Sequence, residues 1–159
     1  GCSPLPARVP NTGGPVTTAH VWNTGKVHAG MLPSSDGIGN ARGRARLYAS
    51  CIGDLDAHRT LTSETVARAS LEQACGKDEV LMSESCFGLG YMLGRSFGAA
   101  NPPDAFGHAG AGGSLAFADP DTGISFAYVM NDLRFDMTEG DPRSEQLVRA
   151  PYRVLAAGR

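Results

Sequence analysis

Lysine is nearly absent from this chain of 159 residues, which contains only Lys26 and Lys77. The residues three positions before them are Asn23 and Ala74, so the sequence has no Ser-x-x-Lys motif. In that motif the lysine lies one helical turn from the serine, on the same face, and accepts its proton. A nucleophile of this kind is therefore excluded from the chain.

A strong charge imbalance and long apolar runs are also lacking. The formal net charge of −2 gives no reason to expect a nucleic acid or an anionic membrane as partner. No apolar run approaches the roughly 20 residues of a membrane helix, and no signal peptide is visible. These absences favour the cytoplasm but leave the compartment open.

Cysteine is sparse, and its spacing fits no metal or redox pattern. Cys2, Cys51, Cys75 and Cys86 form no Cys-x-x-Cys pair. We expect Cys51 to be a buried reduced thiol, and the sequence leaves open whether any disulfide forms. The histidines show no metal-binding spacing either, so we expect no metal and no cofactor.

What the chain does contain is enough apolar material for a core, since 42% of its residues are hydrophobic. Residues 1–30 are rich in Pro, Gly and Thr, which predicts a loop-rich segment of a larger domain, with a short strand near Ala19–Trp22. Residues 31–159 are predicted to form the main folded part.

Three helices are predicted from their capping residues. The first runs from about Asn40 to Ile52 and stops at Gly53; the second spans about Ser63–Cys75 and ends at Gly76. The third begins after Asp141 as N-cap, with Pro142 at its first position, and covers Asp141–Ala150.

Strand patterns fill the region between the second and third helices. Residues 87–93 predict one strand, and residues 114–118 and 124–130 predict a hairpin, because a turn-forming cluster at 119–123 joins them. The fold class is therefore α+β: an antiparallel hairpin sheet with flanking helices. We expect a layer of three adjacent strands with His108 at its edge.

The triplet His108-Ala109-Gly110 lies just before this hairpin, inside a glycine-rich stretch at residues 106–114. Glycine lets a backbone approach a ligand closely and present its N–H groups, and an imidazole can donate or accept a proton. The stretch is therefore a candidate wall of a hydrolytic active site.

Residues 106–131 resemble the third motif and following hairpin of the serine β-lactamase-fold hydrolases, which include class C β-lactamases, DD-peptidases and related esterases. In that family a strand beside the active site carries Lys-Thr-Gly or a variant such as His-Thr-Gly. Here the matching triplet is His108-Ala109-Gly110, and the esterase-like branch fits best. Residues 29–48 resemble a family segment in which a glycine-rich turn leads into a helix.

The resemblance implies roles for five residues. His108 takes the lysine position as the catalytic-site cation or hydrogen-bond donor, Ala109 and Gly110 line the substrate strand, and the backbone N–H of Ala111 is one of two oxyanion donors. Asn131 matches a position that binds a substrate carboxylate in some class C enzymes. Ala109 replaces the usual hydroxyl residue, which favours a neutral ester or amide over a penicillin-type acid.

Two family motifs are missing. Besides Ser-x-x-Lys, no Tyr-x-Asn occurs, and Tyr48-Ala49-Ser50 is rejected because it lies inside a predicted helix. Both motifs precede the matched region in the family, so we expect the chain to be the C-terminal part of a β-lactamase/transpeptidase-like fold, inactive without the N-terminal part. The expected partners are that part and a small ester or amide substrate. The alternative is a non-catalytic binding domain that has lost the nucleophile.

Overall fold

The computed structural model describes residues 23–31, 37–79, 83–98, 100–110, 112–132 and 141–158. The chain divides into two compact units, one formed by residues 1–39 with 78–82 and the other by residues 40–77 with 83–159. In the first unit, α2 (Gly25–His28) is a short helix where the sequence predicted loop. The strand predicted near Ala19–Trp22 lies outside the described residues. The predicted boundary between residues 30 and 31 stays a prediction.

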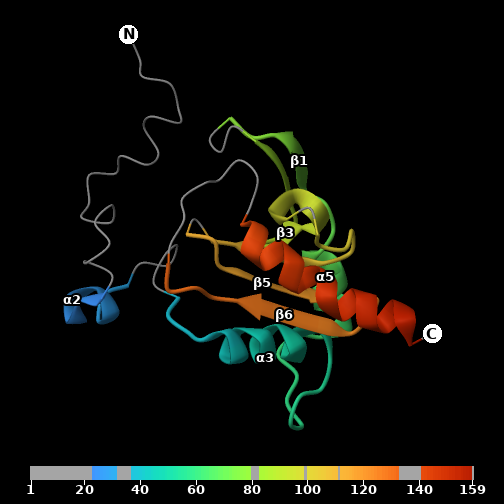
Figure 1. Cartoon of the computed structure of the whole chain (residues 1–159), viewed down its shortest axis with the longest axis horizontal. Coiled ribbons are helices and arrows are strands. Elements are labelled where there is room, and N and C mark those ends of the chain that lie inside the picture. The colour runs from blue at the N-terminus through green and yellow to red at the C-terminus, as the bar shows by residue number, and fades with distance from the viewer. Residues whose placement is uncertain are drawn as a thin grey trace. The chain divides into compact units, whose positions relative to one another are not determined.

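The second unit contains one antiparallel sheet whose six strands follow one another in chain order. The strands are β1 (Ala74–Lys77), β2 (Glu84–Phe87), β3 (Met92–Leu93), β4 (Phe106–Ala109), β5 (Leu115–Asp119) and β6 (Ile124–Tyr128). The helices are α3 (Ala41–Ile52), α4 (Ser63–Ala69), the 3₁₀ turn η3 (Gly94–Phe97) and α5 (Pro142–Ala157). In Figure 1, β6 lies between α5 and α3. The predicted α+β class is confirmed, with three more strands than expected.

Alternating side chains give the sheet two buried faces, because successive residues of a strand point to opposite sides. On the α5 face, Leu115 and Phe117 pack with Val148 of α5. On the α3 face, Phe106 and Ala118 pack with Cys51 of α3 and Val66 of α4. Phe106 and Phe117 are completely buried, so the centre of the sheet is the core of this unit.

The capping predictions at α3 and α5 are confirmed. The Asn40 side chain accepts a hydrogen bond from the Gly43 N–H at 2.7 Å, and α3 ends at Ile52 before Gly53. The Asp141 carboxylate accepts from the Arg143 N–H at 2.9 Å, with Pro142 in the first turn. Such caps satisfy N–H groups that have no partner within the helix. The helix α5 continues to Ala157, seven residues past the predicted end at Ala150.

The predicted helix over Ser63–Cys75 is wrong in its second half. The helix α4 ends at Ala69, and Cys75 and Gly76 belong to β1. The carbonyl of Ala69 accepts from the Leu89 N–H at 2.9 Å, so a distant turn closes the helix end. Beyond it, β1 pairs with β2, and a disulfide joins the directly opposed Cys75 and Cys86. Pairing with residues far along the chain overrides the local helical pattern.

The single strand predicted over residues 87–93 is also wrong. The chain turns at Gly88–Tyr91 and returns as β3, so that Phe87 and Met92 face each other in neighbouring strands. The turn is closed by the Gly88 N–H, which donates to the Tyr91 carbonyl at 2.9 Å. Gly90 has a φ of +86°, which glycine adopts without steric cost.

The hairpin prediction is confirmed in β5 and β6, whose register runs from Leu115↔Tyr128 to Asp119↔Ile124. Within the described ranges, the helices are all too short or too polar to cross a membrane.

Candidate active site

The triplet His108-Ala109-Gly110 lies at the C-terminal end of β4. This strand pairs with β5 along its whole length, up to Ala109↔Leu115, but with β3 only at Phe106 and Gly107. The expectation that His108 lies on an edge strand is therefore wrong, because β4 has a neighbour on both sides. Even so, β3 pairs only with Phe106 and Gly107, so His108 and Ala109 have no partner residue on the β3 side.

The His108 side chain is exposed, whereas Gly107 before it is buried. Its Nδ1 lies 2.6 Å from the Ala109 carbonyl oxygen, and its ring centroid is 6.3 Å from that of Phe87. Among the described residues, the imidazole has no ion-pair partner. By the alternation of the strand it points to the α3 side of the sheet, opposite to Ala109, which packs against the cluster under α5.

Gly110 begins the turn between β4 and β5. Its N–H donates to the Ser114 carbonyl at 2.7 Å, and its own carbonyl accepts from the Gly113 N–H at 2.9 Å. A Cβ at Gly110 would overlap the Ser114 Oγ, so a larger residue there would require the Ser114 side chain to change its rotamer. Because the Gly110 N–H is already bonded, it is not available to a ligand. The proposed oxyanion donor Ala111 lies outside the described residues.

Asn131 is exposed and follows β6 by three residues. In the sheet, Tyr128 is opposite Leu115, and Leu115 is opposite Ala109. The triplet and Asn131 therefore lie at the same end of the sheet, with β5 between them, and neighbouring strands are about 5 Å apart. The structure thus brings His108, Ala109, Gly110 and Asn131 to one sheet end. In the sequence, only the resemblance to the family had linked these residues to one site.

A cluster of charges that the sequence did not reveal holds the same end together. The Asp141 side chain, 5% exposed, accepts from Arg143 Nη2 at 2.6 Å and Nε at 3.0 Å. Arg143 also donates to the Asp132 carbonyl at 3.1 Å, next to Asn131. On its other side the Asp141 carboxylate lies against the Cα of Gly113, which has a φ of +103°. The start of α5 therefore touches both the β4–β5 turn and the segment after β6.

The hydrogen bond to Asp141 raises the pKa of the Arg143 guanidinium, so this guanidinium stays charged at any physiological pH. The sequence identified Asp141 only as an N-cap. Its contact with the β4–β5 turn involves Gly113, which lies 28 positions earlier, so the sequence around Asp141 does not predict it.

The described residues offer no activated nucleophile at this end. Cys51 is a free but buried thiol, as predicted, and burial raises its pKa, which makes a thiol less reactive. Burial also raises the pKa of Tyr48 to about 12. The Tyr48 ring packs within 6.4 Å of Tyr91 and 6.3 Å of Phe106, as a core side chain does.

One cluster of potential metal ligands occurs in the described part of the chain. Glu72, Cys75 and Cys86 have ligand atoms within 4.8 Å of one another. The two sulfurs are bonded to each other as a disulfide, so neither is available as a thiolate ligand. The sequence had left the pairing of these cysteines open.

Similarity to known proteins agrees with this arrangement. A protein 36% identical over 105 residues is the esterase/beta-lactamase LipL of Mycobacterium tuberculosis; the match covers 64% of this chain and 24% of LipL. Among solved structures, a family VIII carboxylesterase is 34% identical with a TM-score of 0.77, over 86% of this chain and 37% of that one.

Two further solved structures share a TM-score of 0.66. EstA from Arthrobacter nitroguajacolicus Rue61a is 35% identical over 74% of this chain and 32% of its own. A penicillin-binding protein homologue from Caulobacter crescentus is 40% identical over 72% of this chain and 31% of its own. The chain thus spans about a quarter of the curated relative and about a third of each solved structure.

The Beta-lactamase family model matches residues 3–149, which is most of the chain. Together with the sheet, its flanking helices and the relatives above, this match shows that the chain belongs to the beta-lactamase family and corresponds to the C-terminal part of a serine hydrolase-related fold.

Proposed function

We propose that this chain supplies one wall of the active site of a serine carboxylic ester hydrolase that works through an acyl-enzyme. The observation that carries the proposal is the exposed His108 at the end of β4, with Asn131 at the same sheet end, in a chain of this family. In this proposal His108 contacts the substrate and the proton-transfer network, since an imidazole both donates and accepts.

The backbone of the triplet and its turn forms the second part of the wall. Ala109 and Gly110 line the substrate strand, and the N–H of Ala111 is one of two oxyanion donors. The Gly110 N–H donates to the Ser114 carbonyl and is therefore not the oxyanion donor, which is consistent with a donor at the next residue, Ala111. Preorganised N–H donors of this kind stabilise the charge that develops on the carbonyl oxygen.

The substrate is proposed to be a neutral ester or amide. LipL is named an esterase/beta-lactamase and the second relative a carboxylesterase, so both names refer to ester hydrolysis by those proteins. Ala109 has no hydroxyl with which to bond a substrate carboxylate, and the exposed amide of Asn131 suits an uncharged polar group equally well. This combination favours an ester over a penicillin-type acid.

The chain on its own is proposed to be inactive, because its sequence has neither Ser-x-x-Lys nor Tyr-x-Asn. The sequence encoded directly before Gly1 is the first test. An in-frame Ser-x-x-Lys followed by Tyr-x-Asn or Tyr-x-Ser supports the enzyme. A start codon there, with no such motifs, favours instead a non-catalytic domain that binds a partner or peptide. The observation that supports this alternative is the absence of both motifs from the chain.

A kinetic test uses a short-chain chromogenic ester. The 159-residue chain should show no turnover that a serine-directed inhibitor removes; turnover of that kind would refute the missing nucleophile. In a longer protein that contains both motifs, Ala111→Pro should lower kcat by about 10² to 10³, because proline has no N–H. Ala111→Gly, which keeps the N–H, is the matched control and should retain most of the activity.

A further inference from the structure

The disulfide between Cys75 and Cys86 lies at the surface of the sheet. Cys75 is exposed and Cys86 is half-buried. Exposed disulfides are the ones that thiols reduce readily, whereas structural disulfides resist reduction by glutathione. The bond also closes a short loop, because the two cysteines are 11 positions apart. Since the entropy that a crosslink removes grows with loop length, its effect is local to the hairpin of β1 and β2.

Few contacts besides this disulfide hold β1 among the described residues. It is an end strand of the sheet, and all four of its residues are exposed (Figure 1). Ala74, Gly76 and Lys77 are residue types that strands disfavour. A ladder of four residue pairs without buried apolar side chains is marginally stable in water. The pairing of β1 with β2 therefore depends on the crosslink.

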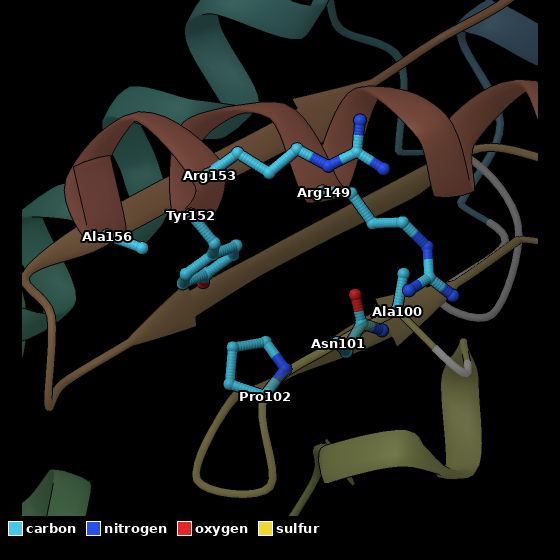
Figure 2. Close-up of a pocket in the computed structure, with 7 residues that line it drawn as sticks. All are labelled: Ala100, Asn101, Pro102, Arg149, Tyr152, Arg153 and Ala156. Atoms are coloured by element: carbon cyan, nitrogen blue, oxygen red, sulfur yellow. The ribbon is translucent and has the colours of Figure 1, made fainter.

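β2, in contrast, is anchored independently of β1. Phe87 packs against the core cluster under α5 and faces Met92 of β3. The Ser96 hydroxyl in η3 donates to the Cys86 carbonyl at 3.0 Å. The loop that follows η3 lies across a depression from Tyr152 of α5, which ties this part of the chain to the core helix (Figure 2). Loss of the crosslink should therefore release β1 and leave β2 in place.

Glu72 offers an interaction that only the reduced cysteine can make. One of its carboxylate oxygens lies 3.7 Å from Cys86 Sγ. A sulfur in a disulfide has no proton to donate, whereas a thiol donates an S–H hydrogen bond that a carboxylate accepts. Glu72 therefore stabilises the dithiol relative to the disulfide.

The hairpin also touches the surroundings of His108. Phe87 directly follows Cys86, and its ring centroid is 6.3 Å from that of the imidazole. The Phe87 carbonyl accepts from the Gln73 N–H at 2.8 Å, immediately before β1. Detachment of β1 removes this support, so the ring of Phe87 shifts relative to His108.

We propose that Cys75 and Cys86 form a reversible thiol–disulfide switch that controls the pairing of β1 with β2. Reduction is favoured by Glu72, detaches β1 and changes the surroundings of His108. The thiolate of a small thiol such as glutathione attacks the exposed Cys75 Sγ, the S–S bond breaks, and Cys86 leaves as a thiolate that takes a proton from water. A second thiol attacks the mixed disulfide and releases Cys75. Two small thiols are thus oxidised to one disulfide.

The switch does not depend on the proposed hydrolase activity, so the 159-residue chain by itself is the sample. Reduced glutathione, then alkylation and peptide mass spectrometry, should label Cys75 and Cys86 in the native chain, while buried Cys51 reacts only after denaturation. Glu72→Ala should need several-fold more glutathione for half reduction, and Glu64→Ala on exposed α4 should not. A bond that stays oxidised until denaturant is added would overturn the proposal, as would equal reduction of Glu72→Ala and wild type.

Amide hydrogen exchange tests the release of β1. Reduction should quicken exchange in β1 by about tenfold or more, while β4 and β5 keep their protection. The double variant Cys75→Ser/Cys86→Ser should exchange like the reduced wild type and ignore glutathione, and protection in β5 shows that it is folded. Unchanged exchange in β1, or faster exchange throughout the sheet, would contradict a local switch.

Proton NMR of the imidazoles tests the link to His108. Reduction should shift the ring signals of His108, which lies beside Phe87, and leave those of exposed His58 unchanged. In Phe87→Leu the shift at His108 should be lost, because leucine has no ring current. Identical His108 signals in the oxidised and reduced wild type would overturn the proposal.

Discussion

The two ends of strands β4–β6 differ in how their polar groups are satisfied. At one end, which we call the closed end, Asp119 is 1% exposed and its carboxylate accepts from the Asp121 N–H, the Thr122 hydroxyl and the Tyr152 hydroxyl at 2.6 to 3.1 Å. At the other, the open end, His108 and Asn131 are exposed. At the closed end the buried carboxylate finds its hydrogen-bond donors within the chain, whereas at the open end the side chains of His108 and Asn131 are accessible to a ligand.

The comparison separates folding from function along the same three strands. Buried polar groups that are fully bonded stabilise a fold, whereas exposed polar side chains cost little to keep and are free to meet a substrate. The open end is not loose, since Asp141 and Arg143 hold its turn and the segment after β6. Stability should therefore depend mainly on the closed end, and the following substitutions test that difference.

Asp119→Ala should have the largest effect and lower the free energy of unfolding by about 3 kcal/mol, because it leaves buried donors without an acceptor. Urea denaturation measures the loss. Exposed Asp121, whose pKa is raised mainly by the neighbouring Asp104 charge, is the control: Asp121→Ala should change the midpoint little. A small effect at Asp119 would show that the closed end does not carry the stability.

Asp141→Ala should lower the free energy of unfolding by about 1 to 2 kcal/mol through loss of the N-cap. Amide hydrogen exchange should also quicken at Gly110 and Gly113 of the open end, while Gly123, bonded to the Asp119 carbonyl, keeps its protection. Asp141→Asn keeps a side-chain oxygen for the N-cap but removes the negative charge, so its effect on the free energy of unfolding measures the contribution of the ion pair with Arg143. Equal changes at Gly113 and Gly123 would contradict an independent open end.

Tyr152→Phe should cost about 1 kcal/mol at neutral pH, for the lost hydrogen bond to Asp119. Burial, and then the Asp119 charge, raise the pKa of Tyr152 above its usual 10.0. The folded state therefore holds this proton more tightly than the unfolded state, and the associated stability is complete below pH 10 and is lost as the pH rises further.

Denaturation midpoints measured from pH 8 to 12 check this third prediction. The wild type should lose stability above pH 10, and Tyr152→Phe should lose it less steeply. The decline should not vanish, because the pKa of Tyr48 is also raised, to about 12. Identical slopes for the two proteins would rule out a contribution of Tyr152 to the closed end.

His108→Ala should have the smallest effect, within about 0.5 kcal/mol, because the side chain is exposed and bonds only to its neighbour's carbonyl. Asn131→Ala, at the other exposed position of the open end, should change the free energy of unfolding equally little. Thermal unfolding measures the change for both variants. A loss well above 1 kcal/mol at His108 would indicate that the imidazole is part of the packing and not a group reserved for a substrate.

Features that depend on neighbouring residues were predictable from the sequence. Asn40 and Asp141 cap their helices because the capping oxygen and the N–H it accepts from lie within three residues of each other. The β5–β6 hairpin follows from alternation on both sides of a turn cluster. The site triplet was found in the same way, because glycine content and one histidine are visible without knowledge of the fold.

Features that depend on distant residues were not predictable. The strand β1 exists because it pairs with β2 and because Cys75 lies opposite Cys86, and local preference there favoured a helix. Gly107 has no room for a side chain because the backbone of Ala116 and Phe117 fills that space. Asp119 looked like an ordinary turn residue, yet its partner Tyr152 is 33 positions away.

The sequence by itself determined the fold class, the starts of α3, α4 and α5, the hairpin, the family and the absence of a Ser-x-x-Lys nucleophile, because short-range patterns or motifs encode each of these features. Only the tertiary structure decided that Asn131 shares a sheet end with His108 and that Asp141 supports the turn after the triplet. The physical reason is that strand register and helix packing bring together residues whose separation along the chain carries no local signal.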